Sequence, residues 1–271
     1  MGMKTYKKVL SIAGSDSGGG AGIQADLKTF SALGCYGMTV ITAVTAQNTQ
    51  GVTGVWPMSV ECVEKQLDAV LSDMGVDAVK IGMLWSLELA QGVADCLLKY
   101  KIKNVVFDPV MVAQSGDSLM ERETSKDLAR FLAPVSSIVT PNIPEASWLL
   151  DYDIPDQKTM EKAARDLGTW GFNHVLLKGG HHMGDRADDV LYSRDKDEIV
   201  ILESSRVDTL NNHGTGCTLS SAVASYLACG YDLKNACYLA KGYITEALKE
   251  GADYSLGKGH GPVHHFYGIW E

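Results

Sequence analysis

A glycine turn placed directly before a predicted helix carries the residue types best suited to chemistry. The turn is Gly214-Thr215-Gly216-Cys217, and apolar residues follow it at helical spacing, among them Leu219, Ala222 and Val223. Glycine lets the backbone turn sharply, so the free N–H groups of the helix start converge and can bind an anion such as a transferring phosphoryl group. Because a helix start lowers the pKa of a thiol, Cys217 is expected to serve as a base or nucleophile. The turn alone is equally compatible with an ordinary glycine-rich helix start and an inert cysteine.

A second glycine-rich loop, residues 14–22, follows the first predicted strand. Residues 20–25 match the G-x-G-x-x-A pattern of dinucleotide-binding proteins, which also requires an acidic residue about 20 positions later. Residues 38–48 contain no carboxylate, and the loop lacks the lysine-serine or lysine-threonine pair of a P-loop. We therefore interpret it as a loop that closes around a small substrate, with Asp16 and Gln47 as polar candidates.

Predicted strands and helices alternate along most of the chain, and the strands are apolar on both faces. This pattern is typical of a parallel sheet that helices cover on both sides. Two later strands, 189–192 and 198–202, predict an antiparallel hairpin at the sheet edge. Ser86 and Asp232 are placed to cap helices, and no linker divides residues 1–271, so we expect a single domain. The alternating elements are strands near 8–13, 38–48, 77–82, 104–107, 137–140 and 174–177, and helices near 23–33, 59–74, 86–98, 122–132, 145–150 and 160–170.

Polar residues follow the carboxyl ends of the predicted strands, where ligands bind in open parallel sheets. Asp108 follows one strand, Asn142 with Glu145 follows the next, and Lys178 follows a third. With the glycine turn they supply an anion cradle, carboxylates for a metal ion and a cation for a nucleotide, which phosphoryl transfer requires. Each has a structural alternative: the middle pair can cap a helix, Asp108 can begin a turn, and Lys178 can be a solvated strand end.

Composition and charge narrow the classes of function. The 271 residues are 45% hydrophobic and 21% charged, as in ordinary globular proteins. A formal net charge of -9 argues against nucleic acid and anionic membranes as partners. No apolar run approaches the ~20 residues that span a bilayer, and residues 1–8 lack the apolar core of a signal peptide. Six cysteines without a C-x-x-C pair predict reduced thiols and a cytoplasmic protein.

Several separate blocks of the sequence resemble the ribokinase-like vitamin kinases. Within that group, the match is close to the bifunctional hydroxymethylpyrimidine/phosphomethylpyrimidine kinases of thiamine biosynthesis, and it extends from the first strand to the tail. Agreement across many blocks is specific, whereas a lone glycine motif is not. Besides the glycine turn, the blocks are Ala13-Gly14-Ser15-Asp16, residues 19–30, Thr45-Ala46-Gln47-Asn48-Thr49, Asp108-Pro109-Val110-Met111, Asn142-x-x-Glu145, Lys178-Gly179-Gly180-His181 and residues 259–266.

The resemblance implies a three-layer α/β/α sandwich and two successive transfers that use ATP and Mg²⁺. The first would phosphorylate 4-amino-5-hydroxymethyl-2-methylpyrimidine, and the second would convert its monophosphate to the diphosphate. The pyrimidine would lie against Gln47, with Gly14, Asp26 and Val110 lining the same pocket, although Asp26 can instead only anchor its helix. We also expect a homodimer. The remaining roles that the resemblance implies are ATP binding for Lys178, Asn142 and Glu145, metal binding for Asp108 and Glu145, and catalysis for Gly214, Thr215, Gly216 and Cys217.

Cys217 departs from the wider ribokinase pattern, in which an aspartate usually holds this position as the base. A thiolate here could take the hydroxymethyl proton, but the loose transition state of phosphoryl transfer needs little help from a base. The second acceptor is an ionised phosphate and needs no base. Loss of Cys217 is therefore expected to harm the first transfer more than the second.

Other functions stay open at this level. A pyridoxal kinase of the same superfamily acts on a similar aromatic alcohol, and one enzyme could have both activities. A cysteine hydrolase could use Cys217 and His213, and a vitamer-binding protein could bind its ligand without turnover. The loop at residues 113–120 is the candidate for movement over the site.

Overall fold

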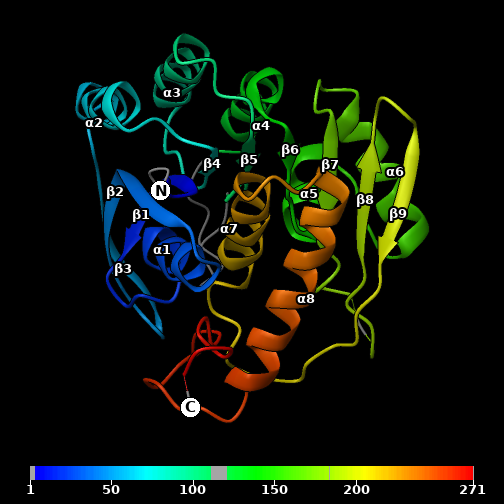
Figure 1. The fold of residues 1–271 in the computed structure, drawn as a ribbon. Helices are drawn as coiled ribbons and strands as arrows, with labels where there is room; N and C mark the ends of the chain where they lie inside the picture. Colours follow the sequence, from blue (N-terminus) through cyan, green and yellow to red (C-terminus); the bar gives the residue numbers. More distant parts are fainter. Residues whose placement is uncertain (1–3, 111–120, 183, 271) are drawn as a thin grey trace.

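The computed structural model describes residues 4–110, 121–182 and 184–270, so Met111 and the loop at 113–120 lie outside the described residues. Within them, nine strands form one sheet in the order β3-β2-β1-β4-β5-β6-β7-β8-β9 (Figure 1). The neighbouring strands β2-β1-β4-β5-β6-β7 pair in parallel. Strands β3, β8 and β9 each pair antiparallel with the strand before them in the chain. The strands are β1 (Lys8–Asp16), β2 (Tyr36–Asn48), β3 (Gly51–Pro57), β4 (Ala78–Ile81), β5 (Val105–Phe107), β6 (Ile138–Val139), β7 (His174–Leu177), β8 (Asp189–Ser193) and β9 (Glu198–Leu202).

Helices cover both faces of the sheet. The helices α1, α7 and α8 lie side by side on one face, and α2 to α6 cover the other, which gives the expected three-layer α/β/α sandwich (Figure 1). Among the described residues, no helix is both long and apolar enough to cross a membrane. The helices are α1 (Gly22–Ala32), α2 (Val60–Asp73), α3 (Leu87–Lys99), α4 (Arg122–Leu132), α5 (Ile143–Leu150), α6 (Gln157–Gly168), α7 (Thr215–Ala228) and α8 (Leu233–Gly251).

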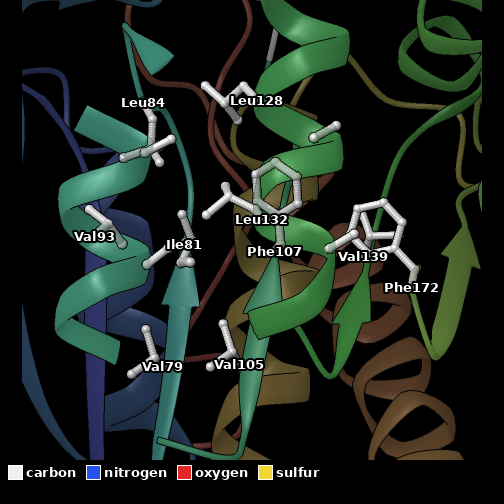
Figure 2. Close-up of a cluster of buried hydrophobic side chains, with 14 of the residues drawn as sticks. Val79, Ile81, Leu84, Val93, Val105, Phe107, Leu128, Leu132, Val139 and Phe172 are labelled. Atoms are coloured by element: carbon white, nitrogen blue, oxygen red, sulfur yellow. The ribbon is translucent and has the colours of Figure 1, made fainter. Parts of the chain in front are cut away.

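The sheet is buried on both faces because successive strand residues enter opposite hydrophobic clusters. In β5, Val105 and Phe107 join the cluster beneath α2 to α6, whereas Val106 joins the cluster beneath α1, α7 and α8. Figure 2 shows Phe107 next to Leu132 of α4. The strands are nearly continuously apolar in sequence because helices cover both faces of the sheet, as the pattern predicts.

Local sequence signals place most elements correctly. The predicted helix at 122–132 is α4, and the predicted edge hairpin is formed by β8 and β9. The caps also form, because Ser86 accepts a hydrogen bond from the backbone N–H of Leu89, and Asp232 accepts one from that of Asn235. The mostly parallel sheet with an antiparallel edge hairpin is confirmed.

The sequence pattern does not predict strand β3. Gly51, Gly54 and Pro57 weaken its strand signal, and its place at the sheet edge leaves it without clear apolar alternation. The strand pairs antiparallel with the end of β2, where Gln47 lies opposite Val52. This hairpin holds the segment that carries Gln47.

Candidate active site

A cavity of about 730 Å³ opens at the carboxyl ends of the parallel strands, and its size is typical of small-molecule sites. Its wall combines the ends of several strands with the start of α7. Residues 204–209 and one side of α8 continue the wall away from the strand ends. The predicted site residues that line this cavity are Gly14, Gln47, Asp108, Val110, Asn142, Glu145, Lys178, Gly214, Thr215, Gly216 and Cys217.

The glycine turn starts α7 at the cavity wall. Gly214 is the N-cap residue with a φ of 79°, and a Cβ at this position would lie 1.7 Å from the carbonyl oxygen of Gly20. Only glycine fits there, because the two glycine loops touch and the backbone is left-handed. Within α7, which is described throughout, no side chain caps the helix start. Its first N–H groups therefore suit an anion.

Lys178 places a positive charge between this turn and two carboxylates. Its Nζ atom lies 2.8 Å from Oδ1 of Asp108 and 3.9 Å from Oε2 of Glu145. A Cβ on Gly216 would lie 3.2 Å from the same Nζ atom. Burial alone would lower the pKa of Lys178, but the charges of Asp108 and Glu145 reverse this effect and raise it. The lysine therefore stays protonated beside the anion site.

The two carboxylates differ in protonation near neutral pH. Burial disfavours the charged form of Asp108, yet Lys178 and Lys80 hold its pKa below the ordinary value. Burial raises the pKa of Glu145 to about 7; Lys178 opposes the rise and Asp108 adds to it. Asp108 is therefore ionised near pH 7, whereas Glu145 still holds a proton part of the time.

Asn142 and Glu145 also form the capping box of α5. Glu145 Oε2 accepts from the backbone N–H of Asn142 at 2.7 Å, and Asn142 Oδ1 accepts from that of Glu145 at 2.8 Å. The capping alternative is therefore correct, although both residues face the cavity as well. No cluster of three or more His, Cys, Asp or Glu that could hold a metal ion occurs among the described residues. A metal ion here would need further oxygen ligands, such as those of a bound phosphate.

Cys217 does not have the lowered pKa that its place at a helix start predicts. Burial raises the pKa of its thiol to about 11; Lys80 opposes this rise, whereas Asp26 and Asp108 add to it. The prediction is wrong because removal of water from the thiol outweighs the field of the helix end. Near pH 7 the side chain is a neutral thiol.

Asp26 does not line the cavity, in contrast to the role that the resemblance implies. It is fully buried in α1, and its two carboxylate oxygens each lie 3.0 Å from Nζ of Lys80. The hydroxyl groups of Ser11 and Ser221 also donate to it. These contacts agree with the alternative that Asp26 anchors its helix, and Lys80 borders the cavity in its place.

Asp16, Gln47 and His213 meet at another part of the cavity wall. His213 Nε2 lies 2.9 Å from Oδ2 of Asp16 and 3.4 Å from the amide nitrogen of Gln47. Burial would raise the pKa of Asp16, but the bond to His213 and backbone N–H groups of residues 18–21 lower it instead. His213 thus faces a carboxylate. The raised pKa of Cys217 does not support the hydrolase alternative, because a thiol nucleophile reacts as its thiolate.

Most of the chain matches one protein family, because a model described as phosphomethylpyrimidine kinase covers residues 16–264. This chain belongs to the phosphomethylpyrimidine kinase family. The hydroxymethylpyrimidine/phosphomethylpyrimidine kinase of Rhizobium meliloti is 49% identical over 97% of this chain and 98% of its own. The protein of the same name from Escherichia coli is 44% identical over 96% and 98%. The thiamine biosynthesis bifunctional protein ThiED of Geobacter sulfurreducens is 49% identical over 95% of this chain, which spans 52% of that protein.

Solved structures of this family and of pyridoxal kinases share the fold. Phosphomethylpyrimidine kinase from Clostridium difficile is 45% identical with a TM-score of 0.78, covering 89% of this chain and 99% of its own. Pyridoxal kinase from Staphylococcus aureus in complex with AMP-PCP and pyridoxal is 34% identical with a TM-score of 0.89, covering 98% and 96%. Since two kinase activities occur on this fold, the fold alone does not choose between them.

Lys80 is among the charged residues of this family member's site that the sequence pattern did not predict. It lies in β4 between Val79 and Ile81 and is fully buried. A lysine inside an otherwise apolar strand is a detectable signal, because a buried lysine needs a charged partner. That partner, Asp26, lies 54 positions away in the chain, so the sequence did not identify the pair.

Proposed function

We propose that this family member is an ATP-dependent kinase of thiamine diphosphate biosynthesis. It would phosphorylate 4-amino-5-hydroxymethyl-2-methylpyrimidine and then the resulting monophosphate. One observation carries the proposal: the free N–H end of α7, the ammonium group of Lys178 and two carboxylates border the same cavity as Gln47. An anion site, a candidate metal site and a candidate acceptor site thus meet in one place.

The transferring phosphoryl group would lie against the N–H groups at Gly216 and Cys217, with Lys178 beside its oxygens. These donors are held by the helix and by the ion pair before any ligand binds, so they stabilise developing charge without rearrangement. The nucleotide would extend along the wall formed by residues 204–209 and α8. Complexes of related pyridoxal kinases with ADP and AMP-PCP support nucleotide binding by this fold.

Asp108 and Glu145 are the residues that would hold Mg²⁺. Mg²⁺ in kinases is bound by one or two carboxylates together with substrate phosphates, and this pair fits that pattern. Bound Mg²⁺ would supply positive charge to the transferring phosphoryl group. Binding must displace the proton that Glu145 holds near pH 7. Activity that EDTA abolishes and Mg²⁺ restores, with a higher Mg²⁺ requirement in Glu145→Gln, would support this assignment.

Kinetics with two acceptor alcohols tests the proposed function. We expect kcat/KM with ATP and the aminopyrimidine alcohol to exceed that with pyridoxal by at least about tenfold, since Gln47 matches the aminopyrimidine edge. The monophosphate should form first and the diphosphate second. A higher kcat/KM with pyridoxal would instead support a pyridoxal kinase. Tight pyrimidine binding without ATP turnover would support a vitamer-binding protein.

We further propose that the chain acts as a single domain, as a homodimer, and in the cytoplasm. The single sheet of the described residues supports the first, and the free thiols of all six cysteines support a reducing compartment. Val44 and Trp56 lie opposite each other on β2 and β3 and are 43% and 59% exposed, which leaves an apolar patch near the sheet edge for a second copy. Light scattering should show a dimer that Trp56→Glu weakens.

A further inference from the structure

A continuous series of polar contacts passes through the side-chain amide of Gln47. At one end, His213 Nε2 lies 2.9 Å from Oδ2 of Asp16 and 3.4 Å from one end of the amide. At the other end, Thr45 Oγ1 lies 3.2 Å from the amide and 2.8 Å from the carbonyl oxygen of Ser15. The amide therefore lies between the imidazole of His213 and the hydroxyl of Thr45. The imidazole also contacts the Asp16 carboxylate and the hydroxyl also contacts the Ser15 carbonyl, and both of these groups can only accept.

The protons of the imidazole end can be assigned from the donor inventory. Asp16 accepts three backbone N–H bonds from residues 18–21 as an ionised carboxylate, so it can only accept from His213. Nε2 of His213 must then carry a proton. This holds for the neutral tautomer with the proton on Nε2 and for the imidazolium ion alike. This single proton is directed mainly at Asp16, 2.9 Å away, so the amide at 3.4 Å faces an N–H that it can only share.

The hydroxyl end can be assigned in the same way. The Ser15 carbonyl only accepts, so the single Thr45 hydroxyl proton is directed to it at 2.8 Å. Thr45 Oγ1 then presents lone pairs to Gln47. If the amide nitrogen faced His213, two N–H donors would oppose each other, and the Thr45 proton would have to serve two acceptors. A half-turn of the amide removes the opposition of the two donors. Its oxygen then shares the Nε2 proton of His213 with Asp16 as the weaker acceptor, and its nitrogen donates to Thr45.

We propose that Asp16, His213 and Thr45 are positioning residues that fix the orientation of the Gln47 amide, and that this orientation selects a 4-aminopyrimidine ring. The inference deepens the proposed function and rests on it. With one N–H and one lone pair engaged, the amide keeps one of each for a ligand. An exocyclic amine beside an unprotonated ring nitrogen complements that pair, as adenine complements glutamine. A 4-oxo ring presents the opposite pattern, an acceptor beside an N–H donor, and would need the reversed amide.

Substrate preference is the readout that tests this proposal. Purified wild type and variants are compared by the ratio of kcat/KM for the 4-amino alcohol to kcat/KM for its 4-oxo analogue, with ATP. His213→Leu removes the donor and should lower the ratio roughly 10- to 100-fold, whereas His213→Gln, which keeps an N–H donor, should restore most of it. Thr45→Val should lower the ratio in the same way, and Thr45→Ser should preserve it.

The ratio of the two kcat/KM values distinguishes a positioning role from a general structural role. Damage to the glycine turn next to His213 would reduce kcat/KM for both rings and leave the ratio unchanged; an unchanged ratio in both His213→Leu and Thr45→Val would overturn the proposal. His260→Ala is the control, because His260 lines the cavity but contacts Asn212, so its ratio should stay at the wild-type value.

The same comparison distinguishes failure of the proposed kinase function from failure of the positioning role. If the wild type phosphorylates neither ring, the proposed function fails, and calorimetric dissociation constants for the two rings then provide the ratio. A binding ratio that favours the amino ring and falls in both His213→Leu and Thr45→Val still supports the positioning role. A binding ratio that these variants do not change overturns it.

Discussion

Lys178 and Asp108 form a buried ion pair, with 2.8 Å between Nζ and Oδ1, at the ends of two strands that flank β6. Asp108 also accepts from the hydroxyl groups of Thr140 and Ser220, each at 3.1 Å. A buried ion pair is stable only when such additional hydrogen bonds satisfy the charges. The pair therefore holds the ammonium group beside Gly216 before any nucleotide binds.

Substitution of the two glycines of the turn should have different effects: one should lower activity and the other should lower stability. In Gly216→Ala the new Cβ would lie 3.2 Å from Nζ of Lys178, which is the end of a flexible side chain. We expect a lower kcat/KM for ATP and a nearly unchanged Tm. In Gly214→Ala the Cβ would meet the Gly20 carbonyl at 1.7 Å with φ at 79°, so we expect a loss of at least about 1–3 kcal/mol of unfolding free energy.

Thermal unfolding and steady-state kinetics measure both effects. Gly242→Ala is the matched control, because a Cβ there meets nothing within 4 Å on helix α8. It should leave activity unchanged and stabilise the helix slightly. A Gly216→Ala protein with wild-type kcat/KM would contradict a role of this turn in binding the phosphoryl group.

The unliganded protein should lose stability between about pH 4.5 and pH 7 because of Glu145. Its pKa is about 7 when folded and 4.5 as a model group. Within this window the folded chain binds a proton that the unfolded chain has released, so raising the pH favours unfolding. Glu145→Gln keeps an acceptor for the capping box and should remove roughly 1–3 kcal/mol of this decline. Urea unfolding at several pH values measures it, and parallel curves for the two proteins would contradict it.

Alkylation of Cys217 should be slow at neutral pH. Its thiol has a pKa of about 11, and the thiolate is the reacting form. The rate with iodoacetamide, followed by mass spectrometry of the peptide that contains Cys217, should rise with pH up to about 11. A plateau already reached near pH 7 would show that the helix start dominates the thiol after all.

Cys217→Ala should affect the two transfers unequally. If the thiolate form of Cys217, which is scarce near pH 7 because its pKa is about 11, accepts the hydroxymethyl proton, kcat for the alcohol should fall roughly 10- to 100-fold. Transfer to the monophosphate should change much less, because its acceptor is already ionised. The two steps are measured separately with the alcohol and the monophosphate as acceptors, and equal losses would rule out this division. Cys217→Ser serves as a control for side-chain volume.

The buried pair of Asp26 and Lys80 should contribute strongly to the orientation of α1 and α7 on the sheet. Asp26→Asn removes the carboxylate that lies 3.0 Å from the lysine charge at 0% exposure, and we expect a loss of roughly 3–5 kcal/mol of unfolding free energy. The double variant with Lys80→Met should recover part of this loss. The exposed pair of Lys99 and Asp68 is the control, and its removal should change stability far less. Urea unfolding of all variants tests the difference.

Patterns among neighbouring residues were enough to predict the architecture and to place several polar residues at the carboxyl ends of the strands. Apolar spacing and helix caps act between neighbours in the chain, so α4 and the Asp232 cap could be predicted without tertiary contacts. Parallel strands bring their carboxyl ends to one edge, so the cavity that Asp108, Asn142 and Lys178 line could also be expected. The edge strand β3 lacked such a signal, because its glycines and exposure remove the apolar alternation.

The environment of each side chain depends on contacts that form only in the folded chain. The raised pKa of Cys217 depends on burial and on charges contributed by α1, β4 and the segment after β5. The pairing of Asp26 with Lys80, and the contact that requires glycine at 214, join residues far apart in the chain. Desolvation and electrostatic interactions follow from which segments meet in space, and local sequence patterns do not contain that information.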